Sequence, residues 1–132
     1  MIQSNAFNYI NVLDKALDAS NLRESILTSN IANVDTPGYK RREVDFASLL
    51  REELDKTKWE SLDQKVDKLN LTRLNATAHY DRAAYGYDYR LDGNNVDIDT
   101  EEVELASEQL RYQLLADSVT QEFSRMKTAI GP

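Results

Sequence analysis

The sequence predicts a mostly α-helical fold: long N- and C-terminal helices paired as an antiparallel coiled coil, joined by a middle segment with a short helix and an irregular stretch or small β-hairpin. Three observations predict it. The 132 residues include only four glycines and two prolines, fewer turn residues than an all-β chain of this size needs. Those helix breakers leave one long uninterrupted stretch at each end of the chain. The length suits a single domain over residues 1–132.

The N-terminal helix is expected within residues 1–34, starting near residue 6. Its apolar side chains recur at steps of three and four, the spacing of one helix face. This row consists of Ile10, Leu13, Leu17, Leu27, Ile31 and Val34, with Ser20 among them. Residues 35–42 then form a turn, because Pro37 disfavours the helical conformation at Thr36 and Gly38 can take the positive φ of a type II turn.

The middle segment, residues 43–98, begins with a pattern typical of a shorter helix from Asp45 to Lys56. Leu62, Val66 and Leu69 have the spacing to continue that helix. From residue 70 to residue 95 the periodicity fades. Tyr87 and Tyr89 alternate there with charged residues, which favours a short strand or hairpin.

The C-terminal helix is expected over residues 99–132, with its regular part at about residues 100–130. Asp99 is the predicted N-cap, and Glu102 stands three residues later, as in a capping box. The apolar residues that follow form two adjacent rows. One row is Val103, Ala106, Leu110 and Leu114; the other is Leu105, Tyr112, Leu115, Val119, Phe123, Met126 and Ile130. A helix of roughly 28 residues is about 42 Å long, longer than a compact domain of this mass is wide, so it requires neighbours along its length.

The composition argues against several classes of function. The formal charge of −7 disfavours binding to nucleic acid or to an anionic lipid surface. No apolar run approaches the roughly 20 residues that span a bilayer. The N-terminus lacks the basic and apolar regions of a secretion signal, so we expect it to be retained. The absence of cysteine excludes disulfides, thiol catalysis and cysteine-bound zinc.

No motif indicates catalysis, a metal or a cofactor. His79 is the only histidine, and it lacks the flanking residues of a metal site or a catalytic triad. The acidic stretch before the last helix resembles a calcium loop, but Gly93 stands second instead of sixth and Val96 occupies a ligand position. Helix capping and solvation explain these acids better. We therefore expect a protein that is not an enzyme.

Residues 29–42 read SNIANVDTPGYKRR and closely resemble the N-terminal signature of bacterial flagellar axial proteins, the family of rod, hook and hook-junction subunits. The continuation REVDFASLL at residues 42–50 and LDGNNVD at residues 91–97 are similar to the proximal rod class of the basal body, the FlgB class. Longer members of the family carry an inserted β-rich domain, for which this chain has no room.

The resemblance implies a structural subunit of the hollow drive shaft. The implied partners are other flagellar rod proteins and further copies of itself, the inner-membrane ring with its rod adaptor, and the flagellar type III export apparatus. The implied location is the basal body rod in the periplasm and cell envelope, reached by export without a cleaved signal peptide. Export signals of the family include a Phe with an apolar residue four positions later. Phe7 is followed there by Asn11, and Tyr9 with Leu13 is the nearest substitute.

Two groups of residues are predicted to carry this role. Subunit packing is assigned to Leu13, Leu17, Ile31, Leu110, Leu114, Val119 and Phe123, and the signature turn to Asn30, Asn33, Pro37, Gly38 and Tyr39. The basic run Lys40-Arg41-Arg42 and the tyrosines around Gly86 are expected to contact adjacent subunits. A second hypothesis is a soluble helical adaptor or regulator that binds one partner helix in an apolar groove.

Overall fold

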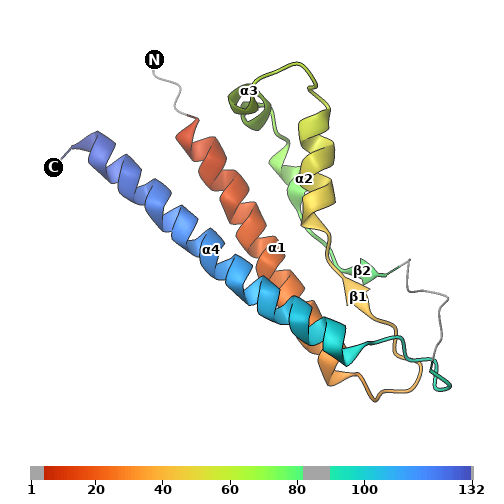
Figure 1. Cartoon of the computed structure of the whole chain (residues 1–132). Helices are drawn as coiled ribbons and strands as arrows, with labels where there is room; N and C mark the ends of the chain where they lie inside the picture. The colour runs from red at the N-terminus through yellow and green to blue at the C-terminus, as the bar shows by residue number, and fades with distance from the viewer. Residues whose placement is uncertain (1–4, 82–89, 132) are drawn as a thin grey trace.

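The computed structural model describes residues 5–81 and 90–131 and contains two long helices with a smaller segment packed beside them (Figure 1). The prediction of a mostly helical chain with long helices at both ends is confirmed. In chain order the elements are α1 (Ala6–Ala32), β1 (Arg42–Glu43), α2 (Phe46–Asp55), α3 (Leu62–Asp67), the 3-10 helix η1 (Leu71–Leu74), β2 (His79–Tyr80) and α4 (Ile98–Ile130).

Helix α1 lies between α4 on one side and the middle segment on the other (Figure 1). The two long helices are antiparallel, since Ser20 of α1 bonds Glu108 of α4 while Asn30, further along α1, bonds the earlier Glu101. The less exposed positions of α4 recur mostly at steps of three and four, as expected for one face of a helix packed along a second helix. They are Glu101, Glu104, Leu105, Glu108, Leu115, Ala116, Ser118, Val119, Glu122 and Met126.

The middle segment covers the other side of α1. Its two short strands pair antiparallel, with Arg42 opposite Tyr80 and Glu43 opposite His79. The hydrophobic core of the described residues is small, because only eight apolar side chains are buried there. They are Ile10, Ala19, Ile26, Leu27, Val44, Val66, Leu74 and Val96.

The start of α1 is tied to α3 by polar side chains. Tyr9 donates its hydroxyl to a carboxylate oxygen of Asp63 at 2.6 Å, and the Asn8 amide donates to Asp67 at 2.9 Å. The hydrogen bond to Asp63, together with the nearby negative charge, raises the pKa of Tyr9. These contacts hold α3 against the first turns of α1.

Two local predictions are wrong, both at helix starts. The predicted helix at 45–56 does not continue through residue 69: α2 ends at Asp55, and α3 starts anew because Ser61 and Gln64 form a capping box. The N-cap of α4 is Asp97 and not Asp99. One carboxylate oxygen of Asp97 accepts from the Asp99 amide at 3.2 Å and the other from the Thr100 hydroxyl at 3.0 Å.

The predicted small β structure exists, but its strands come from distant parts of the chain and do not form a local hairpin. β2 pairs with β1, which directly follows the turn after α1. The expected strand at Tyr87 and Tyr89, and the tyrosine cluster around Gly86, lie outside the described residues.

Candidate assembly interface

The turn after α1 has the geometry that the sequence predicts. Gly38 has a φ of +72°, and the Tyr39 amide donates to the Thr36 carbonyl at 3.2 Å, as in a type II turn. The Gly38 amide donates in turn to the carbonyl of Asp92 at 2.7 Å. The turn is therefore docked on the segment that leads into α4, while Pro37 itself stays exposed.

Asn94 closes the C-terminal end of α1 from outside the helix. Its fully buried amide group donates to the carbonyls of Asn33, Val34 and Thr36 at 2.9, 3.0 and 2.9 Å. A guanidinium nitrogen of Arg90 also donates to the Val34 carbonyl, at 2.6 Å. These donors satisfy carbonyls that a helix end leaves without partners. Asn94 is thus a capping residue for the C-terminal end of α1.

Asn30 connects three elements. Its amide nitrogen donates to the Arg42 carbonyl at 2.8 Å and to Glu101 at 2.9 Å, while its oxygen accepts from the Arg42 amide and the Tyr39 hydroxyl, both at 3.1 Å. Asn30 therefore joins α1 to β1 and α4. Asn33 makes a local contact instead, donating to the Ser29 carbonyl at 2.8 Å. Of the predicted turn residues, the structure brings Asn30 and Tyr39 together.

Arg41 neutralises a buried acid within its own chain. Its Nε lies 2.5 Å from Glu101, which is buried, and its Nη1 lies 2.6 Å from Asp81. Burial by itself lowers the pKa of Arg41, but the hydrogen bonds to Glu101 and Asp81 outweigh it and raise the pKa above the usual value. Within the described residues Arg41 finds its acidic partners in its own chain, so the expected contact of the basic run with an adjacent subunit stays a prediction.

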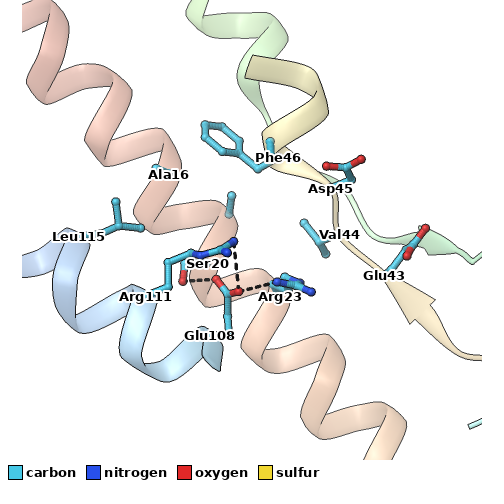
Figure 2. A pocket seen from close by; sticks show the side chains of 12 residues that line it. Ala16, Ser20, Arg23, Glu43, Val44, Asp45, Phe46, Glu108, Arg111 and Leu115 are labelled. Carbon is cyan, nitrogen blue, oxygen red and sulfur yellow. Dashed lines mark hydrogen bonds and ion pairs between the residues drawn. The ribbon is translucent and has the colours of Figure 1, made fainter. Parts of the chain in front are cut away.

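A second buried acid is neutralised about two helix turns away. Glu108 accepts from the Ser20 hydroxyl at 2.6 Å and from Arg23 at 2.7 Å (Figure 2). Arg23 also donates to Glu104 at 3.1 Å. Together with the Arg41 group, these residues make the α1–α4 contact near the turn polar. We call this set the polar clasp: Ser20, Arg23, Asn30, Arg41, Glu101, Glu104 and Glu108. Sequence reasoning missed it.

Helix α4 carries an exposed apolar row on the side opposite α1. Val103, Leu110 and Leu114 are 71, 68 and 67% exposed, respectively. Their positions differ by seven and four residues, so they lie on one helix face, about half a turn from the buried Glu101 and Glu108.

The predicted packing residues fall into two groups. Leu13, Leu17, Ile31 and Val119 are half-buried, whereas Leu110, Leu114 and Phe123 are exposed. The first group is already covered within the chain. The second is available to another molecule.

The described part of the chain shows no arrangement typical of a reactive centre. It contains no group of three or more acidic or histidine side chains that could hold a metal ion. His79 lies on β2 with its Nε2 3.3 Å from Glu43. A search of the same residues found no helix with the length and apolar character to cross a bilayer.

Comparison with known proteins identifies the family. The family model of the flagella basal body rod protein matches residues 10–40, which span most of α1 and the signature turn. The flagellar basal body rod protein FlgB of Bacillus subtilis is 35% identical over 119 residues, covering 89% of each chain. The chain belongs to the FlgB family of flagellar basal body rod proteins. The FlgB proteins of Salmonella typhimurium and Escherichia coli are 36% identical over 106 residues and 32% identical over 127, covering 76% and 88% of each chain, respectively.

Membership of the FlgB family decides between the two hypotheses that the sequence left open. The chain is a structural subunit of the flagellar basal body rod and not an enzyme. The adaptor hypothesis is not favoured by any of these relatives. The structural features described above, the polar clasp and the exposed row of α4, are therefore features of a rod subunit.

Proposed function

We propose that the chain is a subunit of the proximal rod, where it assembles with copies of itself and with other rod proteins into the hollow shaft that transmits torque. The exposed row of α4 is the observation that carries this proposal. Val103, Leu110 and Leu114 face away from α1 and are about two-thirds exposed. An apolar row along a long helix is typical of a helix that packs against another helix.

The magnitudes favour a lattice of contacts over a simple dimer. Fully burying a large aliphatic side chain contributes roughly 1.5–3 kcal/mol. Because these three side chains are only about two-thirds exposed, covering them contributes about 3–6 kcal/mol in total. Association costs about 4–15 kcal/mol in lost freedom. One such contact is insufficient, and each subunit requires several neighbours. Phe123 and Ile130, which are also exposed, lie in the C-terminal part of α4 and can supply further contacts.

We propose that α1 and α4 act as an antiparallel coiled coil in the shaft wall. Support comes from the three- and four-residue spacing of most of the less exposed α4 positions. In this arrangement α4 lies between α1 and a helix of the neighbouring subunit. The polar clasp fixes how far α4 is shifted along α1, since a shift would leave Glu101 and Glu108 buried without their partners.

The remaining partners follow from the family and stay proposals. They are the inner-membrane ring with its rod adaptor, and the flagellar type III export apparatus, through which the chain would pass without a cleaved signal peptide. The small core supports passage in an unfolded state, because eight buried apolar side chains stabilise the chain only weakly. Neighbours in the shaft would then supply the rest of the stability.

The test is a pair of substitutions in the exposed row, Leu110→Gln and Leu114→Gln. Glutamine has nearly the helix propensity of leucine, so the helix content should not change. We expect loss of swimming and of incorporation into basal bodies in a strain that carries only the variant. Gln109→Ala is the matched control, because Gln109 is exposed on α4 about a quarter of a turn away. Normal swimming of the double variant would contradict the proposal.

A further inference from the structure

A cleft of about 320 Å³ opens between α1, α4 and the segment from β1 to the start of α2 (Figure 2). Its floor consists of small side chains of α1, including Ala16, Ala19 and Ser20. Phe46 and Leu115 supply apolar walls on opposite sides. At ~30 Å³ per water molecule the volume corresponds to about ten waters, which is the space of one large side chain and far less than a helix requires.

Trp59 is the only tryptophan of the chain and is 98% exposed, on the loop between α2 and α3. Tryptophan is rarely left in water, and it is strongly enriched among the residues that dominate protein interfaces. The side chain cannot reach the cleft of its own chain. Phe46 at the cleft begins α2, whereas Trp59 follows the end of this ten-residue helix, which is about 15 Å long.

We propose that Trp59 of one copy of this chain inserts into the cleft of a second copy. The tryptophan side chain is among the largest, and a cleft of about 320 Å³ has room for one. Arg111, whose side chain is more than half exposed, lines the cleft and can stack on the indole ring.

The charges around the two surfaces are complementary. Lys58 precedes Trp59 and forms no ion pair within the described part of the chain. Asp45 is exposed at the strand side of the cleft, away from the Arg41 that already pairs with Glu43 at 3.7 Å. Hydrogen bonds from Ser48 lower the pKa of Asp45 further, so it carries its negative charge down to low pH. Although Arg23 and Arg111 also line the cleft, a neighbouring Lys58 can meet the Asp45 carboxylate at its rim when Trp59 enters.

The contact joins two different surfaces, so it leaves a free Trp59 and a free cleft at the ends of every pair. Such head-to-tail contacts grow into open helical assemblies unless they close into a ring. The inference rests on the proposed assembly into a shaft and adds a second contact to the exposed row of α4.

The single tryptophan provides the measurement. We expect the emission of Trp59 in the full chain to shift to shorter wavelength as the protein concentration rises. Ala47→Phe places a bulky ring in the cleft from an exposed position of α2, and should raise the concentration needed for the shift by about thirtyfold or more, the effect of losing a tryptophan hot spot. Ala32→Phe, at an exposed position of α1 outside the cleft, is the matched control and should behave like the unmodified chain.

A complementation experiment tests the direction of the contact. Trp59→Ala has a cleft but no indole, and Ala47→Phe has an indole but a filled cleft. Adding excess Trp59→Ala to dilute Ala47→Phe should restore the blue shift, whereas a chain with both substitutions should not. The inference is overturned if the emission of the unmodified chain shows no blue shift up to its solubility limit. It is also overturned if the chain with both substitutions restores the blue shift of Ala47→Phe as well as Trp59→Ala does. If swimming still depends on Leu110 and Leu114 in that case, only this inference fails and the proposed function stands.

Discussion

Removing Arg41 should destabilise the subunit strongly, because Arg41 neutralises the buried Glu101. Arg41→Met keeps much of the length of the side chain but leaves Glu101 buried, with the Asn30 amide as its remaining partner. Breaking a buried ion pair from one side costs about 3–5 kcal/mol, because the other charge stays desolvated. A domain is stable by only about 5–15 kcal/mol, so the variant should lose a large part of its stability.

Substituting the acidic partner, Glu101, should lower the free energy of unfolding by less than substituting Arg41. Glu101→Gln removes the buried charge, keeps an oxygen for the Asn30 amide, and leaves Arg41 paired with Asp81. We expect about 1–2 kcal/mol for the loss of a charged hydrogen bond. The double variant should be less destabilised than the sum of the single variants by about 2 kcal/mol, since neither charge then remains without the other.

Urea unfolding followed by far-ultraviolet circular dichroism measures all three variants. Lys40→Met is the control, because it removes the positive charge next to Arg41 in the sequence and leaves the ion pair between Arg41 and Glu101 in place. If the effects of Arg41→Met and Glu101→Gln add to within about 0.5 kcal/mol, the two side chains are not coupled. That result would refute the role of the polar clasp in holding α4 against α1.

Three further predictions concern the turn and the helix caps. Asn94→Asp should destabilise the chain by more than the roughly 1–3 kcal/mol expected for Asn94→Ala, as measured by urea unfolding, because a carboxylate would face three carbonyl oxygens. Gly38→Val, with or without Pro37→Ala, should impair swimming while circular dichroism shows α1 intact. Gly38→Asn should be tolerated, since the φ of +72° and not lack of space restricts this position. Asp45→Ala should cost about 1 kcal/mol at neutral pH. Because the pKa of Asp45 is lowered on folding, this difference should be present above its ordinary value of 3.8 and disappear in unfolding titrations as the pH falls through the lower folded value.

The parts of the fold that depend on local signals could be predicted from the sequence. The Pro37-Gly38 pair determines the turn through backbone geometry alone, and the spacing of apolar residues identifies both long helices. The break between α2 and α3 could also have been predicted from the sequence. Ser61 followed by Gln64 is a capping-box pattern, and it outweighs the apolar spacing that favoured a continuous helix.

The polar clasp could not be predicted by the same means because its partners are far apart in the chain. Asn30 and Glu101 are separated by 71 residues, and Arg41 and Glu101 by 60. Acidic residues on a helix normally indicate a solvent-exposed face. The one available signal was that Glu101 and Glu108 continue the three- and four-residue spacing of Leu105, Leu115 and Val119. The apolar rows alone did not show that Leu110 and Leu114 face away from α1, and their assignment to subunit packing stays a prediction.

The burial of Glu101 and Glu108 and the exposure of Leu110 and Leu114 have one physical explanation. If α4 were rotated to cover the leucines with α1, the isolated chain would gain apolar burial, but its apolar row would no longer face outward. The polar clasp opposes that rotation, because it would break the contacts of Arg23 and Arg41 with the two acids. The subunit therefore retains an exposed row at the expense of its own stability. This combination suits a protein whose stability is completed by neighbouring subunits, and it predicts that variants of the clasp damage assembly even where they leave the subunit folded.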